Sequence, residues 1–118
     1  MHPNRIQNLL TGIGWPNGIA LDVNEQTLYW CDAKEDRIES VNVDGTNRKV
    51  IMQDDHLPHP FGLTILGDYL YWTDWQEHTV ERAIKISGED RRVLISHLEG
   101  LMSLQAVAVR PDQVHIYV

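Results

Sequence analysis

The chain has 118 residues, of which 42% are hydrophobic and 23% charged, and its formal net charge is −7 at pH 7. A chain of this length can bury one hydrophobic core, so a single domain is the upper limit. The acidic balance argues against a nucleic-acid site, and no apolar run reaches the roughly 18–20 residues that cross a bilayer. The one cysteine, Cys31, cannot form an internal disulfide.

We expect the N-terminal segment to be the last part of a repeat unit whose first part is not in this sequence. Asn4-Arg5 precedes an apolar run, and the same mark returns at Asn47-Arg48 and at Asp90-Arg91, with a spacing of 43 residues each time. Repeats at a fixed period of this size are the mark of repeat architectures. We predict that residues 1–14 are the outer strand of a truncated unit.

Residues 15–58 form the first complete unit, which has four short segments of strand character separated by turn residues. Asp44-Gly45 supplies the positive φ that a tight hairpin needs, and Ser87-Gly88 is its counterpart in the next unit. The four predicted strands are Gly18–Val23, Thr27–Asp32, Arg37–Val43 and Arg48–Met52.

Residues 59–100 repeat the first unit, and residues 101–118 contain the first strands of another. Trp30 and Trp72 lie 42 positions apart, as do Asp32 and Asp74. No segment has a convincing apolar stripe of helical period. Four antiparallel strands in a period of 42–44 residues are typical of a β-propeller blade. We predict an all-β fold.

An aspartate closes the second predicted strand of each complete unit. Its carboxylate can accept backbone N–H groups of the following loop, or pair with an arginine of a neighbouring blade. A residue that recurs in every blade favours a structural role over a catalytic or metal-binding one, since a functional site is usually a single feature. We therefore predict no catalytic residue, metal or cofactor. The predicted structural residues are Tyr29, Trp30, Asp32, Tyr71, Trp72, Asp74, Arg48 and Arg91.

These segments resemble the YWTD propellers of the low-density-lipoprotein-receptor group. "YWTD" is intact at Tyr71–Asp74 and degenerate as "YWCD" at Tyr29–Asp32, and "PNGIALD" (Pro16–Asp22) and "VDGTNR" (Val43–Arg48) are also typical. "GWPNGIALD", "LPHPFGLTILGDYLYWTDWQ" and "LMSLQAV" look most like the last blades of one propeller in the receptor-related Wnt co-receptors. The third or fourth propeller of such a receptor is implied, with the fourth nearest.

The resemblance implies a partial six-bladed β-propeller with two complete four-stranded blades and two partial ones. It further implies a non-enzymatic, extracellular binding domain of a single-pass plasma-membrane receptor, followed by an EGF-like module. The chain departs from that pattern because most blades and the module are missing, which suggests a piece of a longer protein. It also has Cys31 in place of threonine. A small buried apolar residue is a simpler interpretation of this cysteine than a redox role.

Strand direction brings several candidate ligand-binding residues to one end of the predicted disc. Loops after the second and fourth strands of a blade emerge at the same end, because successive strands run in opposite directions. Apolar and aromatic residues gathered on loops are candidates for an interaction hot spot, although they also plug gaps between blades. In the resembling co-receptors this end takes Wnt ligands or secreted antagonists, and "HPF" and "YWTDW" carry that role to Phe61 and Trp75. The candidates are Trp15, His59, Phe61, Trp75 and Met102.

Acidic residues lie near the same end in the sequence. They would attract a basic ligand and speed its arrival, unless they form only a solvated face. The residues concerned are Glu35, Asp36, Asp54, Asp55 and Glu77.

Two other functions remain open. A lactonase-like six-bladed enzyme would use Asn17 to hold a divalent cation in the central channel, although the matching residue of the next blade is Phe61. A structural propeller would instead dock an EGF-like module of its own receptor at this end and bind no external ligand.

Overall fold

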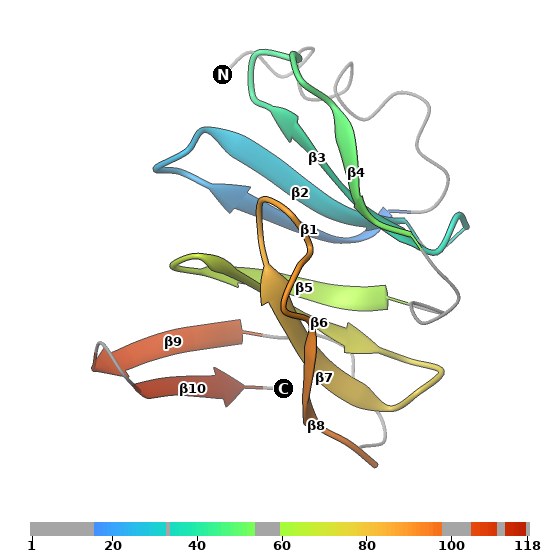
Figure 1. Ribbon diagram of the computed structural model, residues 1–118, viewed down its shortest axis with the longest axis vertical. Helices are drawn as coiled ribbons and strands as arrows, with labels where there is room; N and C mark the ends of the chain where they lie inside the picture. Colours follow the sequence, from blue (N-terminus) through green and yellow to red (C-terminus); the bar gives the residue numbers. More distant parts are fainter. Residues whose placement is uncertain (1–15, 33, 54–59, 98–104, 111–112, 118) are drawn as a thin grey trace.

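The computed structural model of the protein describes residues 16–32, 34–53, 60–97, 105–110 and 113–117. In these residues the chain forms strands and turns and no helix, which confirms the all-β fold class (Figure 1). No helix in the described ranges could therefore cross a membrane. The first blade is built from β1 (Pro16–Asp22), β2 (Thr27–Asp32), β3 (Arg37–Asn42) and β4 (Lys49–Met52). The second blade is built from β5 (Pro60–Leu66), β6 (Tyr69–Asp74), β7 (Thr79–Ile84) and β8 (Arg92–Ile95).

Each blade is an antiparallel sheet in which the strands follow one another in sequence order. A third, two-stranded sheet pairs β9 (Gln105–Arg110) with β10 (Gln113–Tyr117). The observed strands of the first blade differ from the predicted ones by at most two residues at either end. Residues 1–14 lie outside the described residues. The unit boundaries 15–58, 59–100 and 101–118 and the count of six blades stay predictions.

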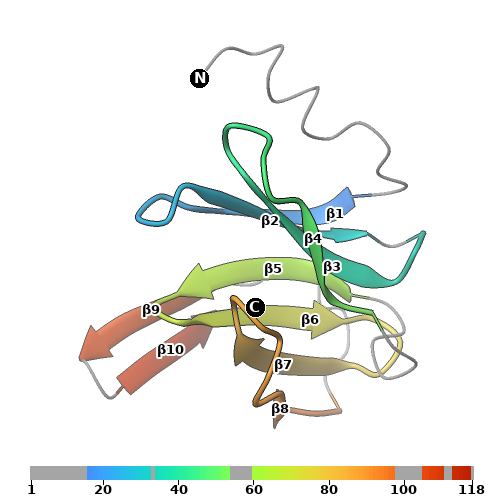
Figure 2. The same cartoon turned by 45° about the horizontal axis from the view of Figure 1, so that its top comes forward.

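The blades stack side by side, with their first strands next to one another. β1 contacts β5, and β5 contacts β9 (Figures 1 and 2). Gly18 of β1 lies so close to β5 that a Cβ atom at this position would meet the carbonyl oxygen of Phe61 at 2.3 Å. The absence of a side chain therefore lets the two strands approach closely.

The core fills the space between the two blades, and side chains from both sheets contribute to it. Both faces of β2 and β6 are covered, so neighbouring residues such as Tyr71 and Trp72 are both buried. This explains why the strand sequences lack the alternation of a sheet with one wet face. The residues of the buried cluster are Tyr29, Cys31, Ile38, Met52, Leu63, Leu70, Trp72 and Ala83.

The hairpin glycines have the conformation that their turns require. Gly45 has φ of 90° and Gly88 has φ of 74°, in the β3–β4 and β7–β8 turns respectively. Such angles are costly for a residue with a Cβ atom. The dipeptides Asp44-Gly45 and Ser87-Gly88 therefore mark these turns correctly.

Candidate functional site

The two aspartates that recur at the ends of β2 and β6 have a structural role in this chain. Asp32 Oδ1 accepts the backbone N–H groups of Lys34 at 3.0 Å and Glu35 at 3.3 Å. Asp74 Oδ1 accepts those of Gln76 and Glu77, both at 2.9 Å. Each carboxylate thus orders the turn that follows its strand, in the way that an Asx turn does.

The turn after Asp74 presents Trp75 at the end of the second blade. Trp75 is 41% exposed, and its ring stacks on that of Phe61 with centroids 4.5 Å apart and an interplanar angle of 3°. Phe61 comes from the irregular start of β5, where the pairing register with β6 shifts between Pro60 and Leu63. Two residues separated by 14 positions in the chain thus form one rigid aromatic surface, which we call the aromatic face.

A buried hydrogen bond holds the strand irregularity in place. The N–H group of Gly62 donates to Thr73 Oγ1 at 2.8 Å. Gly62 follows Phe61, and Thr73 lies two residues before Trp75, so this bond ties together the two strands that carry the rings. Bulges of this kind often re-aim a side chain at a functional site.

A second network connects each motif tryptophan to an arginine and a glutamate. The guanidinium of Arg91 lies 5.5 Å from the Trp72 ring centre and its Nε atom donates to Glu81 at 2.8 Å. Arg48 repeats this arrangement in the first blade, at 5.3 Å from the Trp30 ring and 3.2 Å from Glu39. Both are cation–π contacts combined with an ion pair.

Sequence reasoning missed the two glutamates, which are 3% exposed and central to these networks. Their signal was present, since Glu39 and Glu81 recur 42 positions apart on the third strand of each blade. Buried carboxylates are rare unless they are paired, so a glutamate that recurs in the middle of a blade strand predicts a cationic partner. Arg48 and Arg91 are the recurring cations that fit this requirement.

Burial raises two pKa values at the blade interface. Desolvation, with a smaller contribution from the charge of Asp74, raises the pKa of the Cys31 thiol. Desolvation, with the charges of Asp22 and Glu25, raises the pKa of Tyr29 to about 12. Because the thiolate is the nucleophilic form of cysteine, the buried Cys31 is an inert side chain.

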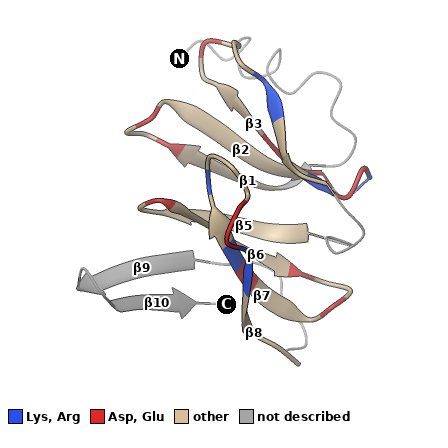
Figure 3. Cartoon of the chain, in the orientation of Figure 1, with Lys and Arg blue, Asp and Glu red and all other residues tan. Residues whose placement is uncertain are grey.

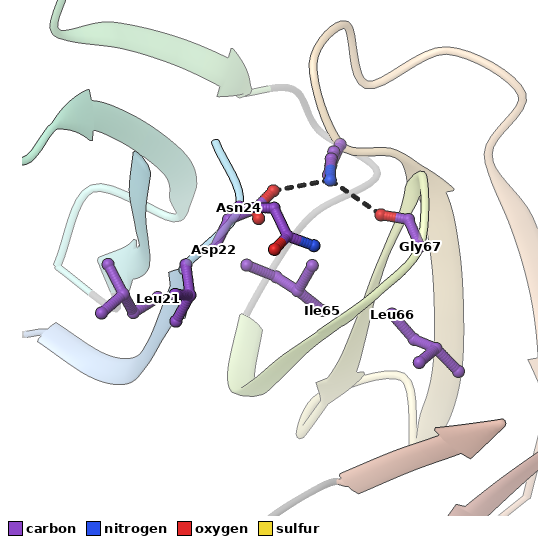
Figure 4. Close-up of a pocket in the computed structure, with 8 residues that line it drawn as sticks. Leu21, Asp22, Asn24, Ile65, Leu66 and Gly67 are labelled. Atoms are coloured by element: carbon purple, nitrogen blue, oxygen red, sulfur yellow. Dashed lines mark hydrogen bonds and ion pairs between the residues drawn. The ribbon is translucent and has the colours of Figure 1, made fainter. Parts of the chain in front are cut away.

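A cavity of about 220 Å³ opens at the opposite end of the blades, between the β1–β2 and β5–β6 turns (Figure 4). Lys85 Nζ lies 2.6 Å from Asp22 Oδ2 of the first blade and donates to the carbonyl oxygen of Gly67 at 2.7 Å. Burial would raise the pKa of Asp22, but Lys85 and the N–H groups of Glu25 and Asn24 outweigh it and lower the pKa. This ion pair was not predicted.

The remaining predicted site residues cannot be placed. The side chains of Trp15, His59 and Met102 lie outside the described residues, as do Asp54 and Asp55. The side chain of Asn17 is also not described. In the described parts of the chain, no group of three or more histidine, cysteine, aspartate or glutamate residues could hold a metal ion.

Comparison with known proteins identifies the repeat. The low-density lipoprotein receptor repeat class B family matches residues 26–65 and 68–109. The chain is 50% identical over 97 residues to the human low-density lipoprotein receptor-related protein 5-like protein, a match that covers 82% of this chain and 38% of that protein. It is 55% identical over 104 residues to human low-density lipoprotein receptor-related protein 5, covering 88% of this chain and 6% of that protein.

The fold has a counterpart among solved structures. A chain in the crystal structure of a nidogen/laminin complex matches 80% of this chain, and 37% of its own length, with a TM-score of 0.71 and 37% sequence identity. This protein therefore spans well under half the length of these relatives. Repeat sequence, strand order and blade packing agree, and the chain belongs to the low-density lipoprotein receptor class B family of YWTD β-propellers.

Proposed function

We propose that this chain is part of an extracellular protein-binding module of a receptor of the low-density-lipoprotein-receptor-related group, and that it binds a secreted Wnt-type ligand or antagonist. The relatives are named as receptor-related proteins, and the nidogen/laminin structure is a complex between proteins. The ligand class, the location outside the cell and the origin in the third or fourth propeller come from the resemblance to the Wnt co-receptors, and "HPF" and "YWTDW" carry the binding role to Phe61 and Trp75. We propose no enzymatic activity.

The stacked pair Phe61 and Trp75 is the observation that carries this proposal. Aromatic rings supply large contact area at a small cost in side-chain entropy, and they are enriched at binding hot spots. Here the Trp75 ring is held by the stack and remains 41% exposed. The surface is thus ordered before a ligand arrives, which reduces the entropic cost of binding.

Charge near the aromatic face favours a basic ligand. The exposed residues Glu35 and Glu77 lie in the β2–β3 and β6–β7 turns, which emerge on the same side of the two blades (Figure 3). Lys34, which directly precedes Glu35, weakens the negative electrostatic potential at this place, but the formal net charge of the chain is −7. Complementary charge mainly increases the association rate. We expect the association rate to fall as ionic strength rises.

Alanine variants at the aromatic face test the proposal. Phe61→Ala or Trp75→Ala in the complete receptor should weaken binding of a purified Wnt protein, or of a secreted antagonist, by about 2 kcal/mol or more. Surface plasmon resonance measures this loss. Ile86→Ala is the matched control, because Ile86 is 63% exposed at the other end of the blade and should leave affinity unchanged.

The same variants separate ligand binding from internal docking. If the aromatic face instead seats an EGF-like module, both alanine variants should reduce secretion or alter domain geometry in small-angle scattering. Normal secretion combined with unchanged affinity for both probes would refute a binding role for these residues.

A further inference from the structure

The apolar surfaces of the two blades are closely alike. The pair Tyr29-Trp30 of the first blade returns as Tyr71-Trp72 in the second, and all four side chains are at most 2% exposed. Apolar burial is not directional and does not by itself decide which blade stacks on which. A repeat protein of this kind is prone to misassembly between blades or between chains.

An ion pair crosses the interface between these similar surfaces (Figure 4). The side chain of Asp22 is 6% exposed and that of Lys85 is 12% exposed, so little of either side chain is in contact with water, although both residues line the cavity at this end of the blades. Lys85 is further held by the Gly67 carbonyl of its own blade, and Asp22 accepts the N–H group of Glu25 at 3.2 Å. The position of each charge is therefore set by its own blade.

Neither charge recurs at the equivalent position of the other complete blade. Asp22 closes the β1–β2 ladder opposite Thr27, and Leu66 closes the β5–β6 ladder opposite Tyr69 in the second blade. Lys85 donates its backbone N–H to Asp68 O at 2.9 Å, and Val43 makes the equivalent bond to Gln26 O at 3.0 Å in the first blade. The counterparts of the charged residues are thus the aliphatic Leu66 and Val43.

We propose that Asp22 and Lys85 form an interface-specific latch that selects the second blade as the neighbour of the first. If either blade packed against a copy of itself, a buried charge would face an aliphatic side chain and lose its partner. An uncompensated buried charge is strongly destabilising, whereas an intact buried pair is close to neutral in stability. The pair therefore discriminates against wrong neighbours without strengthening the right one, as specificity elements do.

Substitutions that remove a charge distinguish the cost of an unpaired buried charge from the net contribution of the intact pair to stability. Lys85→Met keeps the aliphatic stem but leaves the Asp22 charge without its partner, so we expect the thermal unfolding midpoint to fall by about 5 °C or more. Adding Asp22→Asn removes that charge while keeping an oxygen for the Glu25 N–H group. The double variant should recover the midpoint. Lys49→Met, at an exposed position of β4, is the control and should have no effect.

The test of selectivity is which blades become neighbours when two chains associate. Isotopically heavy and light copies of the full chain are unfolded, refolded together and treated with an amine-reactive cross-linker. Mass spectrometry then measures cross-links that join Lys49 of a heavy copy to Lys49 of a light copy, which report contact between two first blades. A swapped pair of chains keeps the first blade against the second and preserves the ion pair, so swapping itself is not the readout. We expect the Asp22→Asn, Lys85→Met variant to form severalfold more of these cross-links than the unchanged chain. An equal yield would overturn the latch, and so would a Lys85→Met variant as stable as Lys49→Met.

Discussion

Cys31 and Thr73 occupy the same position in successive blades but offer different atoms to the backbone. Thr73 Oγ1 accepts the N–H group of Gly62 at 2.8 Å. Cys31 is opposite Gly18, the counterpart of Gly62, in the β1–β2 register and is completely buried. A thiol is a weak hydrogen-bond acceptor. The first blade thus has the same bulge with a poorer acceptor beside it.

Replacement of Cys31 by threonine should stabilise the protein. The hydroxyl would accept the Gly18 N–H group as Thr73 accepts that of Gly62, and one such bond contributes about 1 kcal/mol. Urea unfolding of Cys31→Thr measures this gain in the free energy of unfolding. Cys31→Val provides the shape without the acceptor and should not gain. Equal stability of the two variants would show that the hydroxyl makes no such bond.

At the scale of elements, the close approach of β1 and β5 positions the aromatic face. A Cβ atom on Gly18 would meet Phe61 O at 2.3 Å and Leu63 N at 3.0 Å, both of them backbone atoms. Backbone cannot rotate out of the way as a side chain does, so one strand must shift. Such a shift would move Phe61, whose ring stacks on that of Trp75.

Gly18→Ala should therefore cost more stability than a glycine substitution that creates no contact. Gly67→Ala is the matched control, because no atom lies within 4 Å of its added Cβ atom and the φ of +57° is the source of its cost, about 1–2 kcal/mol. We expect a larger loss for Gly18→Ala in urea unfolding, together with weaker binding of the Wnt or antagonist probe. Equal losses for the two variants would contradict this role of Gly18.

The elements themselves were predictable because their signals are local. Strands, hairpin turns and the recurrence of "YW" with aspartate follow from residue order, and the antiparallel topology brings Phe61 and Trp75 to one end. The link between Lys85 and Asp22 was not predictable, since it joins positions that do not correspond in the two repeats. The ion pair between Arg91 and Glu81 was also not predicted. Both residues recur in each blade, but recurrence alone does not show which arginine or lysine a buried glutamate pairs with.

At the scale of the whole molecule, apolar side chains remain exposed on the flanks of the two-blade stack. Ile19 and Leu21 are 49% and 47% exposed, while Ala20 between them packs against the core. Alternation along β1 therefore places both on the face turned away from the second blade. In β8, Val93 is 57% exposed. Apolar patches of this kind mark surfaces that associate.

We expect the 118-residue chain to self-associate in solution as its concentration rises. Sedimentation velocity should show a growing average mass, and the double variant Ile19→Thr, Leu21→Thr should reduce it while remaining compatible with a strand. Ile86→Thr changes a still more exposed residue, in the β7–β8 turn, and serves as the control. A single monomeric species at all concentrations would disprove association through this flank.

In the turn after each motif aspartate, the residues that stabilise the turn differ from the residue that the turn exposes at the end of the blade. The two bonds to Asp74 Oδ1 come from the N–H groups of Gln76 and Glu77, so neither involves the side chain of the intervening Trp75. In the first blade the same place holds Ala33. A substitution at this one position of a blade can therefore change the surface that a ligand contacts, while the turn and the strands that support it keep their hydrogen bonds.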